Sequence, residues 1–228
     1  MNPKLRLLAA AATAVVAASC TRDSAGPGDR NVSLTIQAGN QQYATPNALL
    51  AEPLKVVVTD ASTKAPVNGA VVRWRLVQGT GAQIAPASST TGADGVATTT
   101  VRLGGVGDYT IESVADNLVG AAPRFTARAV LAPVIASIIP TTVNAGASLA
   151  INGSNFSPIP DENIVLFGGF RARVVTASSN QLGLIVPPCL PSRTLTVQAM
   201  LGAVGSNLMS VDVIGESGTP LLLAPGES

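Results

Sequence analysis

The chain has 228 residues, enough for one large domain or two small ones. Hydrophobic residues make up 46% and aromatic residues only 3%, while Gly (22) and Pro (16) are plentiful, and this composition favours small all-β domains over helical bundles or a large α/β enzyme. The sequence has no His, which excludes His-based acid–base catalysis and His-containing zinc sites, and the net charge of +1 gives no electrostatic reason to expect nucleic-acid binding.

The first 20 residues have the pattern of an export signal. Lys4 and Arg6 precede an apolar run, Leu7–Ala18, which is shorter than the roughly 20 apolar residues that a spanning helix needs. Small residues then lead directly to Cys20. A positive start, a short apolar core and a small-residue box predict a cleaved signal peptide rather than a membrane-spanning helix.

The cysteine at the end of this segment indicates a particular kind of signal. Lipoprotein signal peptides end in a small-residue box directly before a cysteine, and residues 1–20 resemble them, with Ala17 at the position where Leu is commonest. The resemblance implies that residues 1–19 are removed and that Cys20 is the lipid attachment point, since two acyl chains give stable anchoring. An ordinary signal peptide that ends near Cys20 is the alternative. Residues 20–30 are polar and Gly/Pro-rich, which predicts a flexible tether.

Residues 31–130 show the alternation of apolar and polar residues that is typical of half-buried strands. The alternating runs are residues 53–60, 70–79, 95–104, 108–116 and 124–130. Segments rich in Gly, Asp, Asn and Pro lie between them and predict turns. Several short strands at this spacing predict a β-sandwich with Trp74 in its core.

Five short motifs follow one another along this first module. They are Pro53-Leu54, Val58-Thr59-Asp60, Pro66-Val67-Asn68-Gly69, Val72-Arg73-Trp74 and Thr91–Ala97. In this order they resemble the bacterial immunoglobulin-like domain of invasin and intimin. The resemblance implies a stalk or adhesion module and brings no catalytic residue with it.

Two features of the first module could have either a structural role or a role in binding. Asp94-Gly95 is the pair favoured in a tight hairpin turn because Gly accepts positive φ, whereas a calcium loop would need several oxygen ligands and only Asp94 is present locally. Arg73 and Arg75 lie two residues apart on one face. They could bind an anionic glycan or a lipid headgroup, but such a pair is more often part of a solvated sheet face.

Residues 131–133 form a short Pro-containing joint, which favours a semi-rigid arrangement of two modules over free tumbling. Strand-like runs follow, separated by Gly and Pro. They are residues 134–138, 148–152, 163–167, 172–177, 181–186, 194–199 and 210–214.

The landmarks of this second module also form a pattern. They are Pro133, Ile135, Ile138 and Pro140, then Gly146, Ile151, Gly153 and Phe156, then Val165, Phe167, Gly168 and Gly169, and finally Val186-Pro187. They resemble the IPT/TIG immunoglobulin-like domain. That fold serves as a spacer, an enzyme accessory or a DNA-binding partner in different proteins, so the resemblance implies a fold and not a function.

Three residues of the second module are candidates for chemistry. Asp161 and Glu162 are adjacent on one loop, and neighbouring carboxylates rarely face a common substrate at the separation that glycosidases require, so we expect a solvated loop. Cys189 could form an intermolecular disulfide in an oxidising compartment, but we expect a small, partly buried thiol beside rigid prolines. The tail, residues 215–228, could add an edge strand or open a further module.

These observations predict an all-β protein with two tandem immunoglobulin-like β-sandwiches, residues 31–130 and 133–214, after a lipoprotein signal peptide. We expect no enzymatic activity, no cofactor, no metal and no nucleic-acid partner. The expected function is that of an exported lipoprotein, anchored at the bacterial outer membrane or cell surface. Its modules would act as a stalk, in adhesion, or as a platform for a protein or polysaccharide. The alternative is an N-terminal accessory region of a larger secreted or surface enzyme, and the pattern leaves ligand and oligomeric state open.

Overall fold

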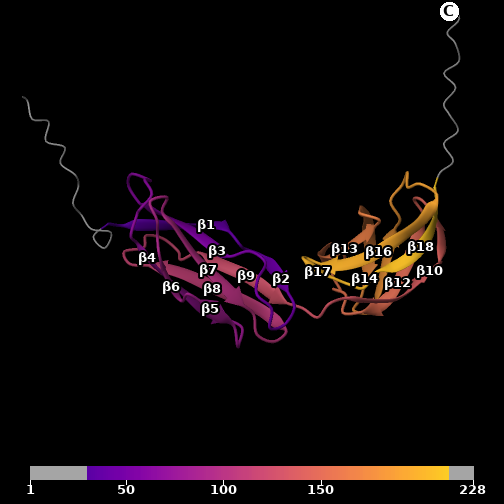
Figure 1. The fold of residues 1–228 in the computed structure, drawn as a ribbon, viewed down its shortest axis with the longest axis horizontal. Helices are drawn as coiled ribbons and strands as arrows, with labels where there is room; N and C mark the ends of the chain where they lie inside the picture. Colours follow the sequence, from indigo (N-terminus) through magenta and orange to yellow (C-terminus); the bar gives the residue numbers. More distant parts are fainter. Residues whose placement is uncertain (1–29, 216–228) are drawn as a thin grey trace, which may run out of the picture.

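The structure, a computed structural model, describes residues 30–215. These residues form strands and one short 3-10 helix, arranged as two β-sandwiches joined end to end (Figure 1), and the predicted all-β immunoglobulin-like class is confirmed. The predicted signal peptide, Cys20, the tether up to residue 29 and the tail from residue 216 lie outside the described residues. Within residues 30–215 we find no helix with the length and apolar character needed to cross a bilayer.

The first module consists of two packed sheets. One sheet has the order β1 (Val32–Ala38), β3 (Leu54–Asp60), β7 (Val96–Arg102) and β5 (Gln83–Ala85). The other has the order β2 (Gln42–Ala44), β9 (Arg124–Ala129), β8 (Gly107–Ala115), β4 (Val71–Gln78) and β6 (Ser88–Thr90). All neighbours are antiparallel except β2 and β9, which run parallel.

The core of the first module lies between these sheets. Alternate residues of β3, namely Leu54, Val56 and Val58, are almost completely buried, as the period of two predicts. Trp74 is also buried and packs against Phe125 with ring centroids 5.8 Å apart. Its indole N–H donates a hydrogen bond to the Ser89 hydroxyl (2.9 Å), so burial of the ring leaves no polar atom unpaired. The predicted core position of Trp74 is therefore confirmed.

The turn at Asp94-Gly95 is present, but it is not a hairpin. Gly95 has φ +72°, and its N–H donates to the carbonyl of Gly92. The strands on either side, β6 and β7, pair with β4 and with β3 in different sheets. The predicted hairpin is therefore wrong. The Asp-Gly pair fixes the local backbone but does not decide whether the next strand returns to the same sheet.

The second module is one continuous path of hydrogen-bonded strands that folds over into two layers. Its order is β10 (Val134–Ile139), β12 (Ser148–Ser154), β15 (Gln181–Ile185), β14 (Phe170–Ala177), β13 (Asn163–Phe167), β16 (Arg193–Leu201), β18 (Met209–Ile214) and β11 (Thr142–Asn144), while β17 (Val204–Gly205) pairs with β16. The 3-10 helix η1 (Pro160–Glu162) precedes β13. The layers join where β14 leaves β13 and continues along β15.

The second module has its own apolar core. Phe167, Ile151, Val165, Leu182 and Val197 are fully buried between the layers. No residue of this cluster belongs to the core cluster of the first module. Each sandwich therefore buries its own apolar surface.

Candidate functional site at the joint between the modules

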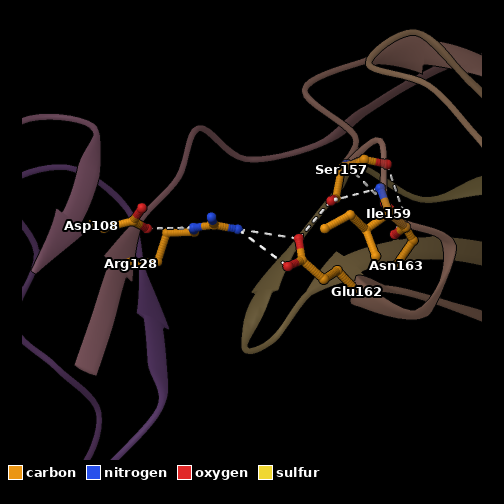
Figure 2. Close-up of polar contacts among 6 residues, drawn as sticks. All are labelled: Asp108, Arg128, Ser157, Ile159, Glu162 and Asn163. Carbon is orange, nitrogen blue, oxygen red and sulfur yellow. Dashed lines mark hydrogen bonds and ion pairs between the residues drawn. The ribbon is translucent and has the colours of Figure 1, made fainter. Parts of the chain in front are cut away.

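The joint is bridged by one arginine at the end of β9. Arg128 Nε donates to Asp108 Oδ1 of the same module (2.6 Å), and Arg128 Nη1 lies 3.2 Å from Glu162 Oε2 of the second module (Figure 2). The hydrogen bond to Asp108 and the charges of Asp108 and Glu162 raise the pKa of Arg128, although partial burial of the guanidinium opposes them. Arg128 is therefore permanently charged and holds carboxylates of both modules.

Glu162 is held in place by the loop that carries it. The Ser157 hydroxyl donates to Glu162 Oε2 (2.6 Å). The buried Asn163 amide fixes the loop, since its Oδ1 accepts from the Ser157 N–H (3.0 Å) and its Nδ2 donates to the carbonyls of Ser157 and Ile159 (each 2.9 Å) (Figure 2). The carboxylate is thus oriented by its own module as well as by the ion pair.

Two further contacts join the modules. Gly202, in the turn between β16 and β17, packs against the ring of Tyr43 on β2 so closely that an added Cβ would lie 2.6 Å from a ring carbon. The Asn155 amide donates to the carbonyl of Ala132 in the linker (2.9 Å). At the other end of the linker, the Val130 N–H still donates to the carbonyl of Ala44 (2.9 Å). Only Leu131 lies between these two hydrogen-bonded residues, which limits how far the modules can bend.

A hollow of about 380 Å³ lies at the joint and is lined by both modules. Tyr43, Val106 and Leu131 give it a largely apolar wall, and Arg128 and Glu162 close one side with a matched pair of charges. Among residues 30–215 we find no group of three or more His, Cys, Asp or Glu side chains that could hold a metal. The arrangement can hold two modules in a fixed relation.

Arg73 and Arg75 project from the exposed face of β4, as predicted, and both are matched by carboxylates. Arg73 forms a two-point ion pair with Asp116 (2.8 Å), and Arg75 pairs with Glu112, which Arg124 also contacts (3.1 Å). Arg73 is neutralised by Asp116, whereas the buried Glu112 is shared by the guanidinium groups of Arg75 and Arg124. The arginines form an ion-pair network on a solvated sheet face.

The environment of Glu112 predicts a pH dependence of stability. Hydrogen bonds from Arg75 and then from Arg124 hold its pKa below the ordinary 4.5. A carboxyl whose folded pKa is lowered contributes stability that is complete above its unfolded pKa and is lost as the pH falls through its folded pKa. We therefore expect Glu112→Gln to have a lower melting temperature of the first module than the wild type at neutral pH. Below about pH 4, where Glu112 of the wild type becomes protonated, the two melting temperatures should approach each other.

Thermal unfolding followed by far-UV circular dichroism between about pH 7 and pH 3 would measure this effect. Glu52→Gln is the matched control, because Glu52 is exposed and its carboxylate makes no ion pair within the described residues. A Glu112→Gln deficit that stays constant down to the lowest pH would show that the carboxylate charge is not what stabilises this face.

The remaining predicted residues separate in the structure. Glu162 faces Arg128 at the joint, whereas the exposed Asp161 lines a different hollow beside β14, so the adjacent carboxylates do not converge on a common point. Cys189 is exposed and has φ +61°, so the expectation of a partly buried thiol is wrong. The next residue, Leu190, takes the buried place in the core.

Of the residues that form the joint, the sequence singled out only Glu162, and as a neighbour of Asp161 rather than as a partner of Arg128. Arg128 alternates with Thr126 and Arg124 on the outer face of β9, a pattern that fits any solvated strand. Tyr43 and Gly202 lie far apart in the sequence and carry no motif. The proline-containing linker was the only available signal, and it predicted a semi-rigid joint without its contacts.

The sequence model of the IPT/TIG domain matches residues 133–218, the second module. No curated protein matches the chain. Among solved structures, similarity extends to a protein from Bacteroides thetaiotaomicron VPI-5482 (16% identity, TM-score 0.34), of which the chain spans only 22% while 37% of the chain is covered.

Two longer matches cover most of the chain. The C-terminal 282-residue fragment of intimin is 15% identical over 78% of this chain and 64% of that one, with a TM-score of 0.42. Domains 4–9 of the surface layer protein SbsC are 13% identical over 81% of this chain and 31% of that one, with a TM-score of 0.33. At such identities and scores, none of these structures bears on what this chain binds.

Proposed function

We propose that the chain is a non-catalytic, lipid-anchored spacer of the bacterial cell envelope, in which two immunoglobulin-like modules form a semi-rigid stalk. The observation that carries this proposal is the joint, where Arg128 bridges Asp108 and Glu162 while Tyr43 packs against Gly202. A short linker with contacts on both sides fixes the orientation of one module relative to the next. A stalk needs this property, whereas modules that act separately do not.

The electrostatics of the first module support the same role. On the sheet of β9, β8 and β4, the outward-facing Arg73, Arg75, Arg124 and Arg128 each pair with a carboxylate, so this face is charged and well hydrated without a strong net field. Such a face keeps a spacer soluble at a crowded surface. Among the described residues there is no group of three or more His, Cys, Asp or Glu side chains that could hold a metal ion.

The anchor is the second part of the proposal and rests on the sequence before residue 21. A thioether-linked diacylglycerol on Cys20, followed by a tether of about ten residues, would hold the first module near the membrane surface. The proposed location is the outer membrane or the cell surface. We propose further that the spacer takes part in adhesion to a protein or a polysaccharide.

Labelling with radioactive palmitate tests the anchor. We expect the full chain, expressed in bacteria, to incorporate label and to sediment with membranes, and the Cys20→Ala variant to lose nearly all of the label and to appear in the soluble fraction. Cys189→Ala is the matched control, because it removes the other cysteine and leaves the signal segment intact. Equal labelling of wild type and Cys20→Ala would contradict the anchor.

A further inference from the structure

A hollow of about 560 Å³ lies on the surface of the second module beside β14. Pro160, Asp161 and Asn163 line one side of it, and Arg171–Val175 line the other. It lies where β14 leaves β13, since the two strands pair only through Phe170–Ala172 and β14 then continues along β15. The edge of β14 is closed here, because β13 pairs with its first residues and η1 also packs against this strand. The hollow therefore offers a ligand side chains and not a strand edge.

Arg171 and Arg173 are the cationic members of this lining. Both are exposed and flank the buried Ala172, so they project from the same face of β14, with Cα atoms about 6.6 Å apart. Neither makes a hydrogen bond or an ion pair through its side chain within residues 30–215. The outward-facing arginines of β4 and β9 in the first module all pair with carboxylates. The hollow thus holds two guanidinium groups side by side with their donors available to a ligand.

The opposite wall presents a hydrogen-bond acceptor. Asp161 is exposed, and its carboxylate makes no ion pair with Arg171, Arg173 or any other cation of the described residues. The Asn163 amide is occupied by the loop before it, so it holds the wall and does not bind. A ligand that carried only anionic groups would be attracted by the arginines and repelled by Asp161. The lining therefore favours a ligand with both anionic groups and hydroxyl donors.

An acidic polysaccharide meets both requirements. Each carboxylate of a uronic acid chain can accept two parallel hydrogen bonds from one guanidinium group, as arginine geometry favours. The hydroxyl groups of the same sugars can donate to the carboxylate of Asp161. A peptide fits less well, because its backbone would need the edge of β14 to continue a hydrogen-bond ladder, and that edge is closed by β13 and η1.

We propose that this hollow, bounded by η1 and β14, binds an acidic polysaccharide, with Arg171 and Arg173 on two of its carboxylates and Asp161 on sugar hydroxyls. The inference names a ligand class for the adhesive role proposed above, and to that extent it rests on the proposed function. It requires neither the lipid anchor nor the joint between the modules, because residues of the second module alone line the hollow.

The test is fluorescence anisotropy of labelled octagalacturonate, titrated at low salt with the full chain carrying Cys20→Ala, so that no lipid contributes to binding. The fully methyl-esterified octamer has the same sugars without their charge and should bind at least about tenfold more weakly. Arg171→Gln/Arg173→Gln should weaken binding of the charged octamer by a similar factor. Arg193→Gln is the matched control, as an exposed strand arginine outside the hollow, and should keep the wild-type affinity.

A second comparison separates a polysaccharide from any other polyanion. Octaglutamate carries as many carboxylates as octagalacturonate but no sugar hydroxyl, so the wild type should bind it more weakly, and Asp161→Asn should narrow this preference by removing the repulsion. Equal binding of the two octamers by the wild type would overturn the assignment to a polysaccharide. Binding of octagalacturonate by Arg171→Gln/Arg173→Gln as tight as that of the wild type would overturn the site. Neither result changes the palmitate labelling or the joint, which have their own tests.

Discussion

Replacing Trp74 by Ala is expected to lower the free energy of unfolding of the first module by about 3–5 kcal/mol and to leave the second module unchanged. The indole is 4% exposed, packs against Phe125, and donates its N–H to Ser89. Truncation would leave a cavity between the two sheets and an unpaired hydroxyl acceptor. The loss is confined to one module because the two core clusters share no residue.

Differential scanning calorimetry, with hydrogen exchange resolved by peptide, would measure this loss without relying on the fluorescence of the lost indole. We expect two transitions, of which Trp74→Ala lowers only the one assigned to residues 30–129. Phe167→Ala is the matched variant, since this fully buried ring belongs to the core of the second module and should lower only the other transition. A single transition that moves with either variant would show that the modules unfold as one unit.

The second large effect is expected at the joint, from the double variant Glu162→Gln/Gly202→Asn. Glu162→Gln removes the charge that faces Arg128 while its amide can still accept from Ser157. Gly202→Asn adds a Cβ that meets the Tyr43 ring, and Asn is among the residues that best tolerate the φ of +55° at this position. If the double variant loses about 1 kcal/mol of the interaction free energy between the modules, the population of bent arrangements should rise about fivefold.

A distance distribution between spin labels on the two modules would show this change as a broadening. Gly146→Asn is the matched control, because Gly146 also has positive φ (+79°) and an added Cβ there meets no atom within 4 Å. Arg171→Gln serves as a control for charge, since Arg171 lies away from the joint. Unchanged widths in the double variant would mean that the linker alone sets the relation between the modules.

Much of the fold follows from local patterns in the sequence. Strands with strict alternation, such as β3 and β4, and strands bounded by Gly or Pro, such as β12 and β13, were predicted close to their observed bounds. The short strands β2, β5, β6, β11 and β17 were not predicted, because two or three residues cannot show a period. Strand β1 was also missed.

The candidate sites were harder to predict, since they depend on which strands become neighbours. Arg73 and Arg75 formed a visible pair in the sequence, but their carboxylate partners, Asp116 and Glu112, are set by the register between β4 and β8. The hollow lined by Arg171 and Arg173 lies where β14 changes partner in mid-strand, and no motif marks that switch.

The measurement that tests the semi-rigid stalk most directly is a spin-label distance distribution across the joint of the otherwise unaltered chain. One label would be placed at Thr63→Cys, in the exposed turn after β3, and the other at the native, exposed Cys189, with Cys20→Ser to leave no third site. We predict one narrow peak. A broad distribution, of the width expected for two modules on a free linker, would contradict the account.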